Sequence, residues 1–154
     1  MHHIDIASFW PGYTVIAQAL SANHHTLFTL EPRADLLPRC RRCLQPTPLI
    51  HDQRIRRVRE RDLFDRQVWL QLPVRRVDCL RCGRVSEHID WLPSGSRLTR
   101  RMQCWIEALV QYLPIRHVSQ LTGGNRSMQW SSDLIGYDAL TSYGSPSYYA
   151  QKMF

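Results

Sequence analysis

The sequence predicts an α+β fold, with a β domain over residues 1–93, a small helical domain over residues 94–123 and a divergent tail over residues 124–154. Three observations support this division. Two Cys-x-x-Cys pairs flank a long segment in which apolar and polar residues alternate, as they do in β-strands. A stretch with apolar residues at helical spacing follows. The composition then changes abruptly, and we expect the tail to be partly or wholly disordered.

Two β-leaning stretches, residues 13–22 and 26–30, open the β domain. They are separated by Asn23, His24 and His25, which are typical of a hairpin turn. The two histidines are also candidate metal ligands, but a polar loop tip is the interpretation that their position favours.

Two further strands are predicted between the cysteine pairs, at residues 49–59 and 66–78. The first alternates poorly because arginines crowd around Ile55 and Val58, and we expect it to line a groove or an exposed face. Pro73 lacks an N–H group, which pushes the second strand toward a sheet edge or a bulge. This second strand alternates with a period of two, and its apolar face comprises Val68, Leu70, Leu72 and Val74.

The paired cysteines predict a structural zinc site in a zinc-ribbon-like β domain. Each Cys-x-x-Cys turn presents two thiolates, and one tetrahedral ion joins the two turns. The spacer between the pairs has 35 residues, so the intervening chain must form its own structure, such as a long hairpin, and return. Gly83 suits the turn that closes the second pair. The expected ligands are Cys40, Cys43, Cys79 and Cys82.

Two other interpretations of these cysteines stay open: a redox dithiol, which would need only one pair, and four unrelated buried thiols. Disulfides are not expected in a chain without a signal peptide, because the cytosol keeps thiols reduced. Cys104 is left over and is interpreted as a free thiol without a role. Neighbouring cations lower thiol pKa values and offset the negative charge of a four-thiolate centre. They are Arg39, Arg41, Arg42, Arg81 and Arg84.

Positive charge is concentrated in the middle of the chain. Residues 33–101 contain 17 of the 20 cations, all of them Arg, against eight of the 13 acids. Because Arg binds phosphates and guanine edges in a bidentate manner, this block predicts a nucleic acid partner. A solvated basic surface, or a coding bias toward Arg, would give the same composition.

The strongest predicted helix starts after Ser96, taken as its N-cap, and Pro114 ends or kinks it. A shorter helix over residues 115–121 follows, and Gly123 closes it. The expected inward-facing residues of the two helices are Leu98, Met102, Trp105, Ile106, Leu109, Leu113, Val118 and Leu121.

These two helices form the first half of a helix-turn-helix pattern. The second half requires a recognition helix with apolar inward positions, but Gly124, Gln129 and Ser132 stand where Ile or Val is needed. We therefore expect no well-packed recognition helix after Gly123.

From about residue 10 to Gly123, the sequence resembles the ISL-three type of bacterial insertion-sequence transposases. The resemblance rests on Pro11-Gly12, the two Cys-x-x-Cys pairs, the Arg-rich segment IHDQRIRRVRERDLFDRQVWLQLPVRRVDC and the segment LPIRHVSQLTG. The resemblance implies a four-cysteine zinc domain and a helix-turn-helix, which in this family are taken to bind the terminal inverted repeats of the element. A large acidic-triad catalytic domain with a ribonuclease H-like core follows in the family.

This chain departs from the family in its last part. The roughly 30 residues after Gly123 are too few for a catalytic domain of typical size, so we expect no catalysis. They are rich in Tyr and Ser and poor in cations, which indicates a truncated or frameshifted gene. A genuine alternative C-terminus is the other interpretation.

We therefore expect a DNA-binding protein derived from a transposase, which binds terminal repeats in double-stranded DNA without catalysis. Arginines from both predicted domains are expected to meet phosphates. His117 is more typical of a surface helix residue than of a base contact. The expected contacts are Arg54, Arg56, Arg57, Arg59, Arg61, Arg75, Arg76, Arg97, Arg100, Arg101, Arg116 and His117.

Two rival functions are retained. The first is a protein-interaction module that pairs with a full-length transposase and inhibits it. The second is a nuclease or transposase whose site uses Asp133 and Asp138 of the tail with Glu107. No apolar run reaches the roughly 18 residues of a membrane span, and the N-terminus lacks a signal-peptide pattern. We expect no membrane partner and a location in the bacterial cytoplasm, at the nucleoid.

Overall fold

The computed structural model describes residues 6–123 of the chain. These residues divide into two compact units, and the division lies between Ile106 and Glu107. This division falls within the helix that spans Arg100–Val110. The first unit contains a mixed sheet, and the tail at residues 124–154 lies outside the described residues.

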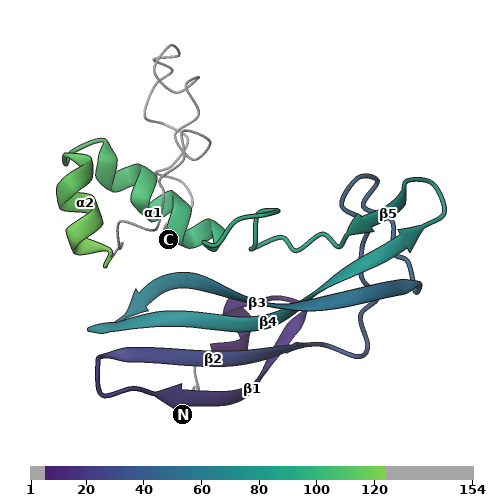
Figure 1. Cartoon of the computed structure of the whole chain (residues 1–154), viewed down its shortest axis with the longest axis horizontal. Coiled ribbons are helices and arrows are strands. Elements are labelled where there is room, and N and C mark those ends of the chain that lie inside the picture. Colours follow the sequence, from purple (N-terminus) through teal and green to yellow (C-terminus); the bar gives the residue numbers. More distant parts are fainter. Residues whose placement is uncertain (1–5, 124–154) are drawn as a thin grey trace. The chain divides into compact units, whose positions relative to one another are not determined.

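The four predicted strands are confirmed, and they join with a short strand that the sequence did not predict in one five-stranded sheet. The strand order is β1-β2-β4-β3, and β5 pairs with the end of β4 (Figure 1). The strands β2 and β4 run parallel, whereas the other pairs are antiparallel. A short 3-10 helix, Ile6–Phe9, precedes the sheet. The strands are β1 (Tyr13–Leu20), β2 (His25–Pro32), β3 (Ile50–Leu63), β4 (Arg66–Cys79) and β5 (Gly83–Ser86).

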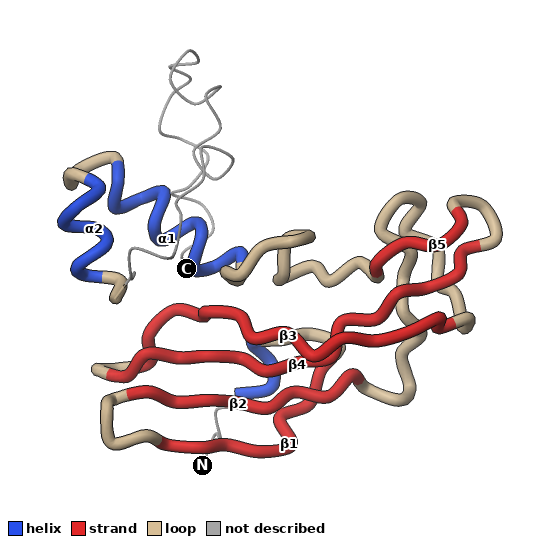
Figure 2. The backbone as a smooth tube through the Cα atoms, viewed as in Figure 1, coloured by secondary structure: helices blue, strands red, loops and turns tan. Residues whose placement is uncertain are grey.

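The long hairpin expected between the cysteine pairs is formed by β3 and β4, which pair over almost their whole length (Figure 2). The predicted apolar face of β4 is confirmed, since Val68, Leu70 and Leu72 are fully buried. Two aromatic side chains pack over this face: Trp10 lies 5.5 Å from the ring of Phe28, measured between centroids. The core of the first unit therefore lies on one face of the sheet.

Strand β4 is central, but Pro73 lies where one of its edges has no strand beside it. Pairing with β2 stops at Gln71, and pairing with β5 starts at Arg76. The N–H of Arg75 faces this gap, so the nitrogen of Pro73, two residues earlier, faces it as well. The prediction of an edge position for Pro73 thus holds locally, because no ladder hydrogen bond is lost there.

Glu87 closes this gap. Its carboxylate accepts hydrogen bonds from the backbone N–H of Arg75 at 2.7 Å and from the Arg75 guanidinium at 2.8 Å. The phenol of Tyr13 donates to the same carboxylate and to the carbonyl of Pro73. Burial raises the pKa of this phenol, and the charge of Glu87 raises it further. Tyr13 therefore stays a neutral donor.

A second buried carboxylate, Glu60 on β3, is only 3% exposed and binds four donors. Its Oε2 accepts from the Trp10 indole at 3.0 Å and from the Arg101 guanidinium at 2.8 Å. Its Oε1 accepts from the Thr99 hydroxyl at 2.9 Å and from the backbone N–H of Arg61 at 2.8 Å. Because every lone-pair direction of this carboxylate is used, its buried charge is compensated. Glu60 thereby links β3 to the segments before and after the sheet.

The helices α1 (Arg100–Val110) and α2 (Ile115–Leu121) follow the sheet. The expected N-cap Ser96 is wrong: Thr99 fills this role, because its hydroxyl accepts from the N–H of Met102. Ser96 instead forms its own turn with Leu98. In α2, Leu121 is exposed and not inward as expected. Within the described residues, no helix is long and apolar enough to cross a membrane.

We expect Glu60→Gln to lower the free energy of unfolding by about 2–4 kcal/mol, because the amide turns a donor toward donors and leaves Arg101 without its carboxylate. Urea unfolding of the two proteins measures this difference. Glu31→Gln, which removes an exposed carboxylate from the same sheet, is the control and should change stability by less than about 0.5 kcal/mol. Equal unfolding midpoints for Glu60→Gln and the control would show that the buried carboxylate does not link these segments.

Candidate metal centre and basic edge

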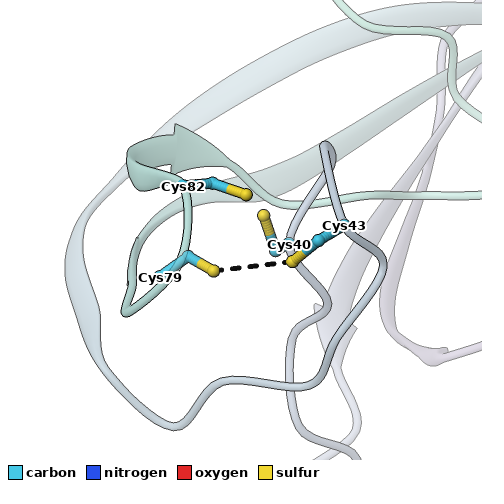
Figure 3. Close-up of side chains that lie close together, drawn as sticks. All are labelled: Cys40, Cys43, Cys79 and Cys82. Carbon is cyan, nitrogen blue, oxygen red and sulfur yellow. Dashed lines mark hydrogen bonds between the residues drawn. The ribbon is translucent and has the colours of Figure 1, made fainter.

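Four cysteine side chains from two distant segments converge at one end of the sheet (Figure 3). Cys40 and Cys43 lie in the loop between β2 and β3, whereas Cys79 ends β4 and Cys82 directly precedes β5. Their sulfur atoms all lie within 4.8 Å of one another, and the Sγ atoms of Cys43 and Cys79 are 3.6 Å apart. The interpretation as four unrelated thiols is therefore wrong, and the cluster is able to hold a metal ion.

The two Cys-x-x-Cys turns have the same backbone feature. The residue after the second cysteine adopts a positive φ in both, at 59° for Leu44 and at 71° for Gly83. In the first turn the N–H of Leu44 donates to the carbonyl of Cys40 at 2.8 Å, which folds the chain back. Glycine was expected at this position in the second turn, and the structure confirms its left-handed conformation.

The surroundings of the sulfurs favour a cation. The backbone N–H groups of Cys43 and Arg42 lower the pKa of the Cys40 thiol to about 6. Burial raises the pKa of the Cys82 thiol to about 12, and the neighbouring sulfurs add to this effect. The first thiolate forms readily, whereas the last is opposed by burial and by the charge already present, so a bound cation would offset both costs.

The donor set fits a tetrahedral ion. A metal–sulfur distance of about 2.3 Å in a tetrahedron gives sulfur–sulfur separations of about 3.8 Å, close to the 3.6 Å between Cys43 and Cys79. Cys40 is fully buried and Cys79 is nearly so, whereas the other two cysteines are half-buried. Such a closed set of four thiolates leaves no position for a substrate, which is typical of structural metal sites.

Each of the eight acids of the central block lies within ion-pair distance of a basic side chain in the described structure. Six of them pair with arginines and two with histidines. The arginines used in this way are Arg33, Arg59, Arg75, Arg76, Arg84 and Arg101. Because no carboxylate of the block is left over, the remaining arginines account for its positive charge.

The expectation that Arg59 contacts DNA does not fit its position in the structure. Its side chain is fully buried, pairs with Asp62 and donates to the carbonyl of Val68 at 3.1 Å. A guanidinium at this depth does not reach a phosphate. Arg75 is held in a similar way by Glu87, and its side chain is only 13% exposed.

Four further expected contacts also have internal partners, and one of them, the exposed Arg100, donates to the carbonyl of Asp90 at 3.3 Å. Arg56 donates to the backbone carbonyls of Gly95 and Ser96, so it anchors the loop before α1. Arg76 pairs with Asp52, and Arg101 pairs with Glu60. The crowded arginines of β3 therefore do not line one groove, because successive side chains of a strand point to opposite faces and meet different partners.

Five of the expected contacts form a different feature, which we call the β3-edge band. The backbone of residues 97–99 runs along β3: the N–H of Arg59 donates to the carbonyl of Arg97 at 2.8 Å, and the N–H of Thr99 donates back to Arg59 at 3.0 Å. Exposed guanidiniums of both segments therefore lie along one edge of the sheet. The band comprises Arg54, Arg57, Arg61, Arg97 and Arg100.

Aromatic rings support two members of this band. The guanidinium carbon of Arg57 lies 5.2 Å from the ring centroid of Trp69, and that of Arg61 lies 5.3 Å from the ring centroid of Trp105. Such stacking orients a guanidinium and leaves its N–H groups at the rim free to bind an anion. In the second unit, Arg116 and His117 of α2 are exposed.

Sequence reasoning did not identify Glu60 and Glu87, which decide which arginines remain available. Glu60 stands between Arg59 and Arg61, whereas Glu87 stands between Ser86 and His88, and neither had a pattern of its own. For Glu60, a single acid within an arginine run, opposite an apolar strand, was the available signal.

A comparison with known proteins finds a transposase of an insertion sequence. The relative is the transposase for insertion sequence element IS1001 of Bordetella parapertussis, which is 30% identical over 114 residues. The similarity covers 72% of this chain but 28% of the relative, so the chain spans less than a third of the relative's length. No protein-family model and no solved structure matches the chain.

The matched turns predict opposite effects of two substitutions. We expect Gly83→Ala to lower the stability of the metal-loaded protein by about 1 kcal/mol, because φ of 71° disfavours a Cβ although space is available. Leu44→Gly should leave stability unchanged or raise it by up to about 1 kcal/mol, since it relieves the same strain. Chemical denaturation at constant metal concentration compares them. The reverse order of stabilities would contradict this account of the turns.

Proposed function

We propose that this chain is a DNA-binding protein derived from a transposase, and that it binds the terminal inverted repeats of a mobile element in double-stranded DNA at the bacterial nucleoid. The observation that supports this most is the complete internal use of the eight central acids, which leaves the exposed arginines of the β3-edge band available. The similarity to a transposase agrees with a DNA partner.

The β3-edge band would contact phosphates. Its members lie on two backbone segments that are hydrogen-bonded to each other at Arg59, so the backbone positions from which these side chains extend are fixed before DNA binds. Pre-arranged cations lose little conformational freedom on binding and release counterions from the DNA. Additional phosphate contacts would come from the exposed Arg41, Arg42 and Arg81 of the cysteine turns.

We propose zinc as the ion of the cysteine cluster. Zinc favours four thiolates in a tetrahedron and has no redox chemistry, which suits a closed structural site. The ion would hold the loop after β2 against the ends of β4 and β5, and thereby fix the cysteine-turn arginines. No step of DNA binding needs the metal as a direct contact.

We further propose that α1 and α2 are the first two helices of a helix-turn-helix, and that Arg116 and His117 extend the footprint. The recognition helix of such a motif would follow Gly123, outside the described residues, and the sequence there does not favour it. The protein would therefore bind DNA mainly through phosphates and discriminate sequences weakly.

We propose that this chain does not itself catalyse strand transfer. Among residues 6–123, the cysteines form the one cluster suited to hold a metal ion, and no carboxylate cluster of that kind is present. Glu107 is exposed, while Asp133 and Asp138 lie outside the described residues. Docking on a full-length transposase is the second candidate function, favoured by the uncharged edge strand β1.

The response of DNA affinity to salt tests the proposal. If five arginines contact phosphates, log K should fall with log salt at a slope of about −4 to −5, and replacing Arg54, Arg57 and Arg61 by Ala should flatten this slope by about two to three units. Fluorescence anisotropy with a duplex carrying the element ends measures it. Arg33→Ala, which removes the partner of Asp35 away from the band, should flatten it by less than one unit. A response that does not depend on salt would favour the docking function.

Elemental analysis tests the metal. We expect one zinc ion per chain in native protein, and we expect Cys40→Ser to abolish it and to lower the Tm by on the order of 10 °C, because structural zinc contributes several kcal/mol to folding. Cys104→Ser is the matched control, since Cys104 is exposed and lies outside the cluster. Unchanged metal content in Cys40→Ser would contradict the assigned ligand set.

A further inference from the structure

The exposed arginines of the cysteine turns and those of the β3-edge band belong to one surface. The segment between β5 and α1 runs beside β3 (Figure 1). Arg41 of the first cysteine turn donates to the hydroxyl of Ser94 in this segment. Two residues later the carbonyl of Ser96 accepts a hydrogen bond from Arg56 of β3 at 2.7 Å, and Arg97 of the band follows. We call the combined surface the extended basic edge; it comprises the β3-edge band with Arg41, Arg42 and Arg81.

The length of the extended basic edge follows from the register of β3. The N–H of Asp78 donates to the carbonyl of Leu49 at 2.9 Å, so Leu49 lies level with the second cysteine turn, which begins at Cys79. Arg61 is the band residue nearest the opposite end of β3. Residues 49–61 span about 35–40 Å at about 3.3 Å per residue, allowing for the bulge at the start of β3. One turn of B-form DNA is about 34–36 Å long, so the edge has the length of about one helical turn.

Positive charge extends over the whole of this length. Exposed arginines stand at the cysteine turns (Arg42 and Arg81), in the middle (Arg54 and Arg57) and at the far end (Arg61). Duplex DNA carries its phosphates at regular intervals along a stiff rod, so it meets a straight row of cations at several points at once. A single strand is flexible and loses more conformational freedom when it follows the same row. The extended basic edge therefore fits duplex DNA better than a single strand.

We propose that the extended basic edge binds one helical turn of a single DNA duplex, with the cysteine turns at one end of this helical turn and Arg61 at the other. This inference rests on the proposed function, because it names the form and the length of the DNA that these arginines bind. Phosphates one helical turn apart face the same side of a straight duplex, so the edge meets both ends without bending the DNA. The cysteine turns thereby set one boundary of the site.

The affinity of the full, metal-loaded chain for short duplexes tests the proposal. The probes are DNA hairpins closed by the same short loop, and anisotropy gives affinities that are divided by the number of possible registers. The β3-edge band alone covers a duplex of about 6 base pairs, whereas one of about 12 base pairs also reaches the cysteine turns. We expect Arg42→Ala with Arg81→Ala to weaken binding of the longer duplex about tenfold and that of the shorter one by less than about twofold.

The matched comparison is Arg54→Ala with Arg57→Ala, which removes two arginines that both duplexes reach. It should weaken binding of the two duplexes by similar factors. Arg33→Ala removes an exposed arginine outside the extended basic edge and should change neither affinity by more than about twofold. A single strand of about 12 nucleotides should bind at least about tenfold more weakly than the longer duplex. Circular dichroism and elemental analysis confirm that each variant is folded and keeps its metal.

Two results would overturn this inference and leave the proposed function intact. The first is an effect of Arg42→Ala with Arg81→Ala that is the same for both duplexes, because the cysteine turns would then not share one duplex with the band. The second is a single strand that binds as tightly as the longer duplex. Absence of binding to any DNA would contradict the proposed function itself.

Discussion

Strand β4 pairs with three other strands, and both ends of the sheet take their positions from it. Its first half holds β2 and β3, its second half holds β3 and β5, and its last residue is Cys79. The hairpin register with β3 therefore decides where Cys79 meets the cysteines of the loop before β3. A slip of one residue would turn Leu70 and Leu72 to the opposite face and break this meeting, so the apolar core and the cysteine cluster depend on the same register.

The buried carboxylates then determine which charges remain at the surface. Glu60 and Glu87 each bind a guanidinium together with neutral donors from other segments, so they serve the fold and reduce the number of free cations. Removing water from such a group is costly unless each lone pair has a donor, and both residues meet this condition. Arginines with the same sequence appearance consequently divide into structural ones, such as Arg59, and exposed ones, such as Arg57.

The hairpin and the cysteine cluster could be predicted because their signals are local: period-two alternation in β4, and thiols at the spacing of metal ligands. The parallel pairing of β2 with β4 could not, since nothing in either segment specifies a neighbour about 40 residues away. The set of exposed arginines could not be predicted from the sequence either, because whether Arg59 or Arg57 is buried depends on which face of β3 meets a partner. The start of α1 was misplaced because Ser96 and Thr99 are both good caps, and only the contact of Thr99 with Glu60 distinguishes them.

The parallel β2–β4 pair also sets the order of events during synthesis. The β1–β2 hairpin leaves the ribosome first, and the strand that covers its inner edge follows only after the loop with the first cysteines and all of β3. At about 5–20 residues per second, this interval lasts roughly two to eight seconds. Throughout it, the nascent hairpin exposes Phe28 and Leu30 and has two open edges. A pause of synthesis within β3 therefore prolongs the time in which the inner edge of the hairpin stays uncovered.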